Sequence, residues 1–378
     1  MNRPQSRAIL LTTALAIALV VAACGPAPAA SQTGSAAPAG ATATPAKTEP
    51  VKANLKVQGY VGLNLSWLTQ VAIEKGFFSR NGITAEFIPT ATGVQAVAGL
   101  ISDSYQTSVC DPTICLPAVD KGEQMAVIAG QVGSLMTLVV GKDVALPNLS
   151  KGFPDSFQDL KGKKIGVAGV GSITYYLTLA TIKAAGLPEG SVDLVPTGAP
   201  AESIAALRSK RVDGWIAYGP GRSELLASGD AKVVLDWDHP GNAFDKYPTL
   251  KSLTGTPQGA IWAKKSWIAQ NPKVVDQYRL ALMQADVWMH DPKNRPEFLQ
   301  LFKTKFGAPQ GMDVDRYVND NLSTAKSYFS KEGAQTWLDF VVEYGVIKKP
   351  IPVDQWLAPG TPQNEDEVRR AVAAAGGV

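Results

Sequence analysis

Residues 87–90, Phe-Ile-Pro-Thr, recur 107 positions later as Leu-Val-Pro-Thr at residues 194–197. At the same offset the apolar stretch Val97–Leu100 matches Ile204–Leu207. The matched region covers one strand–helix–strand–helix–strand unit, so the sequence predicts two similar lobes that face each other across a cleft. Two unrelated units of this kind also share apolar periodicity, and chance similarity is the alternative.

The chain around this repeat alternates between short β-like runs and helical segments. Strands separated by helices of about 10–15 residues are typical of βαβ units and a largely parallel sheet. After about residue 265 the pattern turns helical, so we expect an α/β fold with a helical C-terminal region. The predicted strands include Leu55–Val61, Thr84–Ile88, Tyr105–Val109, Met125–Ala129, Met136–Gly141 and Lys164–Ala168, and the predicted C-terminal helices are Pro272–Met289, Arg295–Phe306, Val314–Phe329, Gly333–Tyr344 and one from Glu365.

The N-terminus is not predicted to belong to the folded body. Arg3 and Arg7 precede an apolar run, Ala8–Val21, which is too short to span a membrane and matches an export signal. The run leads into Ala-Ala-Cys, which resembles the bacterial lipoprotein cleavage box, so we expect Cys24 to become the lipidated first residue. An ordinary signal peptide with a cysteine nearby is the alternative.

We therefore assign residues 1–23 to a signal peptide and residues 24–52 to a tether. Residues 25–50 are almost wholly Ala, Pro, Gly, Ser and Thr, a composition that cannot bury a core. The whole chain has 36 basic and 33 acidic residues, with a net charge of +3 and no basic stripe, so we expect no nucleic-acid partner.

Residues 72–78, Ala-Ile-Glu-Lys-Gly-Phe-Phe, with Asn-Gly-Ile at 81–83, resemble a signature of periplasmic solute-binding proteins of the sulfonate, nitrate and thiamine-precursor group. In that group a Gly-Val-Gly-Ser-like turn opens the second lobe, as residues 169–172 do here, and a stretch similar to Leu207–Gly214 recurs. The resemblance covers about residues 55–290.

This resemblance implies a type II periplasmic-binding-protein (Venus flytrap) fold. Its first lobe would comprise residues 53–142 and 238–378, and its second lobe residues 143–237. It also implies an extracytoplasmic receptor that passes a small solute to an ABC permease with its cytoplasmic ATPase. We expect a monomer that contacts the membrane only through its lipid anchor. A lipoprotein that senses a solute and signals to a membrane protein is the alternative.

In open α/β sheets, ligands bind beyond the carboxyl ends of the strands, where helix N-termini present free N–H groups. Small, hydroxyl and aromatic residues gather at such junctions here, at residues 62–67, 89–94, 110–113 and 169–174. The candidate ligand-binding residues are Ser66, Trp67, Thr92, Gly93, Asp111, Gly171, Ser172, Thr174, Trp215 and Tyr218.

Each candidate has a structural alternative. The hydroxyl residues can be plain helix N-caps, and Trp215 lies inside a strand where it can equally be core. Asp111 either caps the helix that starts at Pro112 or receives an amine or ring N–H of the ligand. Because no Lys or Arg occupies an equivalent position, an organic solute that is planar or bears an amide is favoured over nitrate or sulfate.

Motifs typical of enzymes are incomplete in this sequence. Gly169-x-Gly171 lacks the third glycine and the acidic residue of a dinucleotide-binding turn, so no cofactor is expected. Two histidines leave little room for a metal site. Pyrimidine-precursor synthases that share this fold carry a cysteine-rich iron motif, which this sequence lacks, so an enzyme is the less favoured alternative.

Cys110 and Cys115 remain in an oxidising compartment once Cys24 is lipidated, and pairing is expected there. Pro112 forces a turn between them, so we predict a disulfide that holds the loop carrying Asp111. The alternative is two reduced, buried cysteines.

The anchor can be tested directly. Cys24→Ala should abolish incorporation of a tagged fatty acid and leave uncleaved or freely soluble protein, because the thiol of Cys24 is the acylated group. Lipid labelling with membrane fractionation measures this, and a Cys110→Ala/Cys115→Ala double variant should keep its label. Wild-type protein that is soluble and carries no acyl group would contradict the lipoprotein prediction.

Overall fold

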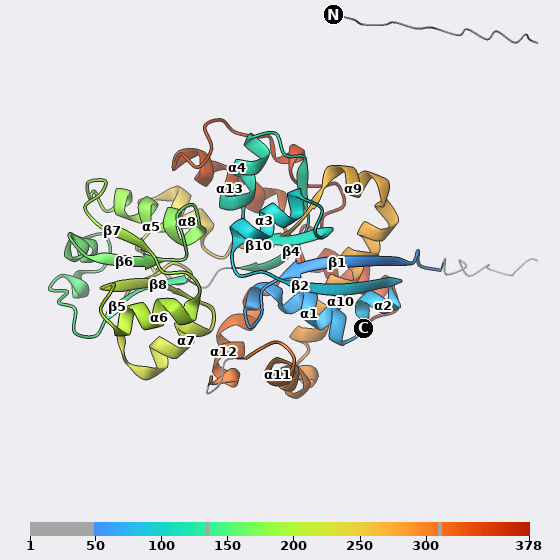
Figure 1. Ribbon diagram of the computed structural model, residues 1–378, viewed down its shortest axis with the longest axis horizontal. Coiled ribbons are helices and arrows are strands. Elements are labelled where there is room, and N and C mark those ends of the chain that lie inside the picture. The colour runs from blue at the N-terminus through green and yellow to red at the C-terminus, as the bar shows by residue number, and fades with distance from the viewer. Residues whose placement is uncertain (1–48, 134–135, 309–311) are drawn as a thin grey trace, which may run out of the picture. The chain divides into compact units, whose positions relative to one another are not determined.

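The computed structural model describes residues 49–133, 136–308 and 312–378 (Figure 1). The expected signal peptide, most of the tether and Cys24 lie outside the described residues. Within the described ranges, no helix combines the length and apolar character that a membrane span requires.

Two five-stranded sheets form the centres of two lobes (Figure 1). The first sheet has the order β2-β1-β3-β10-β4, and the second has the order β7-β6-β8-β5-β9. The strands of the first sheet are β1 (Ala53–Gly59), β2 (Ile83–Pro89), β3 (Thr107–Cys110), β4 (Met125–Gly133) and β10 (Pro257–Lys264). Those of the second are β5 (Met136–Gly141), β6 (Lys164–Val167), β7 (Asp193–Pro196), β8 (Gly214–Tyr218) and β9 (Ala231–Asp236).

Both sheets have the same pattern of strand directions. β1 is parallel to β2 and β3, just as β6 is parallel to β7 and β8. The fourth strand of each sheet, β10 or β5, is antiparallel to both of its neighbours. The α/β fold with two lobes is therefore confirmed.

The helices follow the same repeat. The first residues of α3 and α6, of α4 and α7, and of β3 and β8 are each 107 positions apart, which confirms the repeat predicted from the sequence. The helices are α1 (Trp67–Glu74), α2 (Phe77–Arg80), α3 (Gly93–Ile101), α4 (Pro112–Asp120), α5 (Ile173–Ala184), α6 (Pro200–Arg208), α7 (Gly219–Ser228), α8 (Pro248–Leu253), α9 (Lys265–Gln270), α10 (Pro272–His290), α11 (Arg295–Thr304), α12 (Val314–Asn321), α13 (Lys331–Glu343) and α14 (Glu365–Ala374). Short 3-10 helices cover Asn64–Ser66, Leu149–Lys151, Asp155–Leu160, Pro292–Asn294, Leu322–Thr324 and Val353–Gln355.

The boundary between the lobes differs from the sequence prediction. We predicted that residues 53–142 belong to the first lobe, but β5 pairs with β8 and β9 of the second sheet. The chain therefore leaves the first lobe after Gly133 and not after residue 142. Hereafter the first lobe comprises residues 49–133, 257–308 and 312–378, the second lobe comprises residues 136–236, and residues 237–256 connect them.

The predicted helix Val314–Phe329 is too long. α12 ends at Asn321 because the chain then pairs with β4, where Ala325 forms a bridge with Val132. The Asp286 carboxylate also accepts hydrogen bonds from the backbone N–H and hydroxyl of Ser327, each at 2.7 Å. These distant partners hold residues 325–327 out of a helical conformation, and a local helical pattern cannot reveal them.

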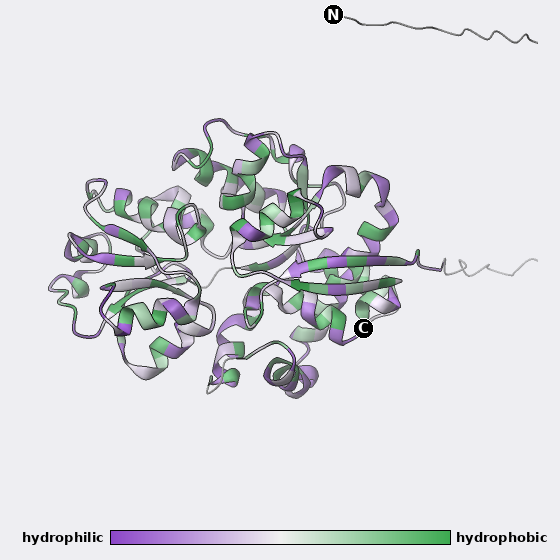
Figure 2. Ribbon diagram, viewed as in Figure 1, coloured by the Kyte–Doolittle hydropathy of each residue, from purple (hydrophilic) through white to green (hydrophobic). Residues whose placement is uncertain are grey.

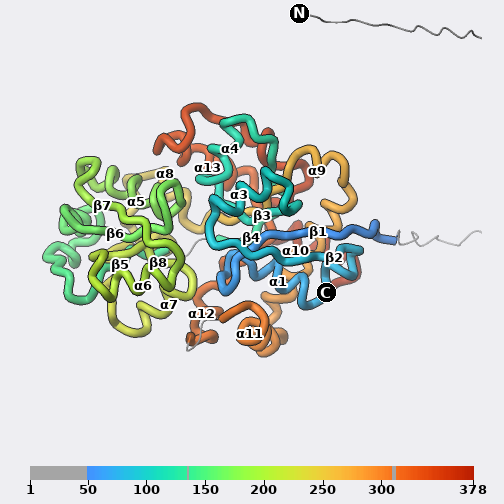
Figure 3. The backbone as a smooth tube through the Cα atoms, viewed as in Figure 1, coloured from blue at the N-terminus to red at the C-terminus, as the bar shows by residue number. Residues whose placement is uncertain are grey.

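Hydrogen bonds fix the connection between the lobes. Figure 3 shows β4 in the first lobe and β5 in the second. The backbone N–H of Trp237 donates to the carbonyl of Met136 at 3.1 Å, and the N–H of Met136 donates to the Asp238 carboxylate at 2.7 Å. The outgoing and returning segments are therefore joined where they leave the second lobe.

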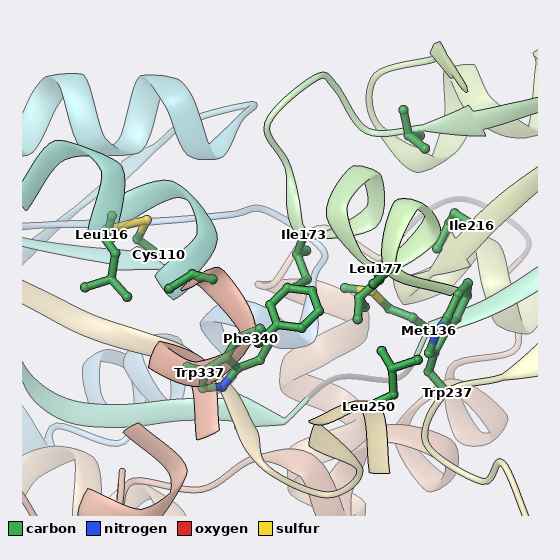
Figure 4. Close-up of a cluster of buried hydrophobic side chains, with 14 of the residues drawn as sticks. Cys110, Leu116, Met136, Ile173, Leu177, Ile216, Trp237, Leu250, Trp337 and Phe340 are labelled. Atoms are coloured by element: carbon green, nitrogen blue, oxygen red, sulfur yellow. A yellow bond between two sulfur atoms is a disulfide. The ribbon is translucent and has the colours of Figure 1, made fainter. Parts of the chain in front are cut away.

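A continuous buried cluster joins the two lobes. Figure 4 shows Trp337 and Phe340 of α13 in the first lobe and Ile173 and Leu177 of α5 in the second, with Ile173 pointing toward Phe340. A second cluster packs α1, α10, α11 and α12 against the first sheet. Figure 2 shows green and purple residues alternating along most helices, as expected when one face of each helix is buried.

Burial raises the pKa of Asp238 from its ordinary value of 3.8 to about 7. Folding therefore favours the protonated carboxyl, and the stability that this group contributes is present below about pH 4 and lost as the pH rises through about 7. Asp238→Asn stays neutral and keeps an acceptor for the Met136 N–H. We predict that raising the pH from 5 to 8 lowers the unfolding free energy of the wild type, measured in urea titrations. The decrease in Asp238→Asn should be smaller by about 1–3 kcal/mol. The exposed Asp143→Asn should follow the wild type, and identical pH profiles for all three proteins would contradict the prediction.

Candidate functional site

A cavity of about 240 Å³ lies between the two lobes. Its walls come from the loops after β1, β2 and β3 in the first lobe and after β6, β7 and β8 in the second. These are the carboxyl ends of the parallel strands, where ligands of open α/β sheets bind. The start of β10 and the start of β5 complete the walls.

Five helices begin at this cavity. The first residues or N-caps of α3, α4, α5, α6 and α7 contribute to its lining. N–H groups in a first helical turn have no partner within the helix, and they carry the positive end of the helix dipole. No Lys, Arg or His is among the described residues that line the cavity. A negatively charged group would therefore be held by backbone N–H groups.

Thr92, Gly93 and Asp111, all predicted as site residues, line the cavity from the first lobe. Thr92 caps α3, and its hydroxyl oxygen accepts the Gln95 N–H at 3.3 Å, which leaves its own hydrogen free to donate. Asp111 caps α4, and its Oδ1 accepts the backbone N–H of Thr113 at 2.9 Å and the Thr113 hydroxyl. Burial raises the pKa of Asp111 to about 6, so the carboxylate is mostly charged at neutral pH.

Ser172 and Thr174, also predicted, line the cavity from the second lobe. The Ser172 hydroxyl donates to the Gly169 carbonyl at 2.7 Å and accepts the Tyr175 N–H at 3.3 Å. The Thr174 hydroxyl accepts the Ala168 N–H at 2.9 Å and lies 2.8 Å from that of Ser172. These side chains shape the loop before α5, so that the N-cap Ser172 and the first helical residues Ile173 and Thr174 line the cavity.

Tyr218 lines the cavity as predicted, and Tyr60 faces it from the other lobe. The Tyr60 hydroxyl donates to the Val109 carbonyl at 3.3 Å, and the Tyr218 hydroxyl donates to the Gly198 carbonyl at 3.4 Å. Burial raises the pKa of both phenols, and the Asp111 charge adds to the effect at Tyr60. Both rings therefore stay neutral and offer flat apolar surface to a solute.

The structure contradicts the predicted ligand-binding roles of Trp67 and Trp215. Trp67 is 0% exposed and packs edge-on against Phe298, Phe302 and Tyr317, with ring centroids 5.2 to 5.6 Å away. Trp215 is also fully buried, within the core of the second lobe. Neither lines the cavity, because both face the helices that cover their own sheets rather than the strand ends.

Ser66 and Gly171 are also outside the lining. Ser66 is buried, and its hydroxyl oxygen accepts the Tyr60 N–H at 2.6 Å, so it positions the loop that carries Tyr60. Gly171 has a φ of +84°, a conformation that glycine adopts without strain, and it serves the turn before α5.

Sequence reasoning missed Gln258, Met136 and the loop at Gly198–Ala199. The repeat could have found the loop, because Ala199 caps α6 at the position equivalent to Thr92. Gln258 was detectable only as a polar residue beside a glycine in an otherwise apolar strand.

The structure joins Cys110 to Cys115, with their Cα atoms 6.4 Å apart. Cys110 is the last residue of β3 and Cys115 lies in α4, so the link encloses Asp111. The pair therefore holds the start of α4 against the strand that precedes it. No cluster of His, Cys, Asp or Glu suited to a metal ion is found among the described residues.

Two matched lobes with a ligand-sized cavity between them are the architecture of a solute-binding protein. Residues 46–303 match the NMT1-like family, and the chain belongs to that family. It is 27% identical over 256 residues to the taurine-binding periplasmic protein of Escherichia coli, covering 65% of this chain and 71% of that one.

Two solved structures share the fold. The alkanesulfonate-binding protein of Xanthomonas axonopodis, bound to MOPS, superposes with a TM-score of 0.63 at 18% identity, covering 82% of this chain and 99% of that one. The nitrate-binding protein of Synechocystis superposes with a TM-score of 0.62 at 16% identity, covering 86% and 90%. The expected family and fold are confirmed.

Because Trp67 is buried in the core of the first lobe, its removal should lower the stability of the protein. Trp67→Ala should lower the unfolding free energy by about 3–5 kcal/mol, because it empties a cavity among three aromatic rings. Denaturant unfolding measures this, and Trp267→Ala, which is only half-buried, should lose less. A Trp67→Ala protein with unchanged stability and weakened ligand binding would show that the indole reaches the solute after all.

Proposed function

We propose that this protein is the extracytoplasmic solute-binding component of an ABC importer. It captures a small organic solute, a sulfonate, a pyrimidine precursor or a related planar or anionic compound, in the cavity between its lobes. The observation that carries the proposal is that the loops of both sheets line one cavity, so a bound solute contacts both lobes.

Contacts with both lobes matter because a ligand shifts an open–closed equilibrium only through contacts that differ between the two states. The lobes already touch beside the cavity. Ser223 of α7 donates to the Asp320 carboxylate of α12 at 3.2 Å, and a Cβ on Gly219 would lie 3.0 Å from Leu63 Cδ2. A permease can recognise this closed arrangement as the loaded receptor.

The chemistry of the lining favours capture over catalysis. Among the described residues the lining offers one carboxylate, two tyrosines and no histidine, lysine or arginine. Burial raises the pKa of both phenols, so neither is matched to proton transfer near neutral pH. Backbone N–H groups, hydroxyls, two tyrosines and aliphatic side chains suit reversible binding. We further propose a monomer held at the membrane by lipid on Cys24, with the permease and its ATPase as partners.

A solute panel tests the function. Taurine, short alkanesulfonates, nitrate and aminopyrimidines should be added to the purified protein in calorimetry and thermal melts. A true ligand at 100 times its Kd should raise the unfolding free energy by about 2.7 kcal/mol. Absence of binding across the panel would contradict the proposed solute classes.

Two glycines, one at each end of α7, test whether closure is part of binding: Gly219 is its first residue and Gly229 is its C-cap. Gly219→Ala should weaken the ligand by about 1–2 kcal/mol, roughly tenfold, because its Cβ would press against Leu63 of the other lobe. Gly229 also has a positive φ, +69°, but a Cβ there would meet nothing within 4 Å. Gly229→Ala should therefore lower only the melting temperature. Equal ligand affinities of the two variants would argue against closure of the lobes on the solute.

A further inference from the structure

The chain has two histidines, and one of them, His290, belongs to a hydrogen-bond network at the end of α10. Its Nδ1 atom lies 2.9 Å from the backbone carbonyl oxygen of Asp286 and 2.9 Å from Asp286 Oδ1. Its Nε2 atom lies 3.1 Å from the carbonyl oxygen of Leu322, in the 3-10 helix that follows α12. Both ring nitrogens therefore face oxygen atoms, on two different segments of the chain.

This arrangement requires a doubly protonated ring. A neutral imidazole carries one N–H, and its second nitrogen can only accept a hydrogen bond. Backbone carbonyl oxygens cannot donate one, so the neutral form would set the lone pair of one ring nitrogen against the oxygen that it faces. The imidazolium donates on both sides at once, and its charge also suits the C-terminal end of α10, where the helix dipole is negative.

The surroundings of the ring favour the charged form. Burial opposes the positive charge of His290, but the hydrogen bonds and the negative charge of Asp286, together with the Leu322 carbonyl, outweigh burial and raise the pKa of His290 above its ordinary value of 6.5. The side chain is still 28% exposed, so the ring can exchange its proton with solvent while the protein stays folded.

Other charged groups around this end of α10 have partners of their own. The Asp291 carboxylate caps the next 3-10 helix and accepts the Lys293 N–H at 3.0 Å. Arg295 of α11 donates to a backbone carbonyl of α12 at 3.3 Å, and the Lys326 ammonium lies over the ring of Tyr328. Of these groups and Asp286, only Asp286 forms an ion pair with His290.

Asp286 also holds the other end of the segment that His290 contacts. Its Oδ1 faces His290, and its Oδ2 accepts the backbone N–H and the hydroxyl of Ser327, each at 2.7 Å. His290 thus holds Leu322 and Asp286 holds Ser327, so the two residues of α10 fasten both ends of residues 322–327. Because Asp286 is largely buried, its charge depends on the imidazolium beside it.

Residues 322–327 support one wall of the cavity from behind. Asn64 and Gly133 line the cavity from the first lobe. Asn64 Nδ2 donates to the Thr324 hydroxyl at 3.5 Å, and a Cβ on Gly133 would lie 3.5 Å from Thr324 Cβ. A change in how firmly the segment is held therefore reaches two residues of the lining.

We propose that Asp286 and His290 form a pH-sensitive clamp that holds residues 322–327 against the cavity wall while the imidazole is protonated and releases them when it is neutral. Because folding raises the pKa of His290, the stability that the clamp contributes is full below about pH 6.5 and is lost as the pH rises through the raised pKa. Loss of the proton removes a hydrogen bond and leaves the Asp286 carboxylate without its cation. The segment then opens locally while the lobes stay folded.

Proton NMR tests the charge state of the ring. The Cε1 proton of His290 should titrate with a midpoint above pH 6.5 in the wild-type protein. His239→Gln removes the only other histidine of the chain, so the remaining signal belongs to His290. A midpoint at or below pH 6.5 would overturn the proposal.

Amide hydrogen exchange tests the release of the segment. The Ser327 N–H donates to Asp286, and the Gly130 N–H of β4 donates to the Ser327 carbonyl at 3.0 Å. After correction for the intrinsic effect of pH, both amides should exchange roughly tenfold faster at pH 9 than at pH 6. The Thr197 N–H of the second lobe, which donates to the Val167 carbonyl at 2.8 Å, should show no such change.

Two substitutions of His290 separate its charge from its bulk. His290→Lys keeps a positive charge and N–H donors at both pH values, so Ser327 and Gly130 should exchange slowly at pH 9 as well. His290→Gln is neutral throughout, so both amides should already exchange fast at pH 6. His239→Gln makes the same change at an exposed histidine and should follow the wild type.

Equal corrected exchange at pH 6 and pH 9 in the wild-type protein would overturn the proposal even if neither His290 variant folds. Persistence of the pH dependence in His290→Lys and His290→Gln would also overturn it, because another group would then be titrating. All of these measurements use the ligand-free protein, so their outcome does not depend on the proposed function.

Discussion

Parallel strands that share a sheet all end at the same edge, and this constraint places every loop of the cavity. In each lobe three parallel strands end there, and five of these six strands are followed by an α-helix whose first residue or N-cap lines the cavity. The antiparallel fourth strand runs the other way, so it brings its beginning to the same edge. That is why Gln258 near the start of β10 and Met136 at the start of β5 reach the cavity although no parallel strand carries them.

The repeat made much of this geometry predictable from the sequence. Its offset of 107 residues locates α6 and α7 once α3 and α4 are known, and Thr92, Asp111, Ser172 and Tyr218 stand at strand ends because strand and helix periodicities meet there. Local rules were sufficient for these positions, since an N-cap is recognised by the residue types on either side of it.

The wrong predictions concern residues whose conformation depends on contacts with distant parts of the sequence. Patterns among neighbouring residues do not reveal such contacts. Trp67 is adjacent to a strand end, but the rings that bury it lie more than 200 residues away on α11 and α12. The segment from Ala325 to Ser327 has a helical pattern but is held out of a helix by β4 and by Asp286. Gln258 belongs to a strand whose partner, β3, lies in the other half of the sequence. In each case long-range pairing decides the outcome, and a single sequence does not record it.

The return of the chain to the first lobe also orders the steps by which the protein folds. The second sheet is made from one continuous stretch, residues 136–236, so all of its pairings can form before the chain returns to the first lobe. The first sheet is interrupted, because β3 and β4 are both neighbours of β10, which is reached only after the second lobe is complete. Until β10 inserts, β3 and β4 expose unpaired edges of the kind that associate with the wrong partners. Insertion of β10 closes that gap and brings Gln258 to the cavity in the same event, so the pairing that covers the edges of β3 and β4 also completes part of the cavity wall.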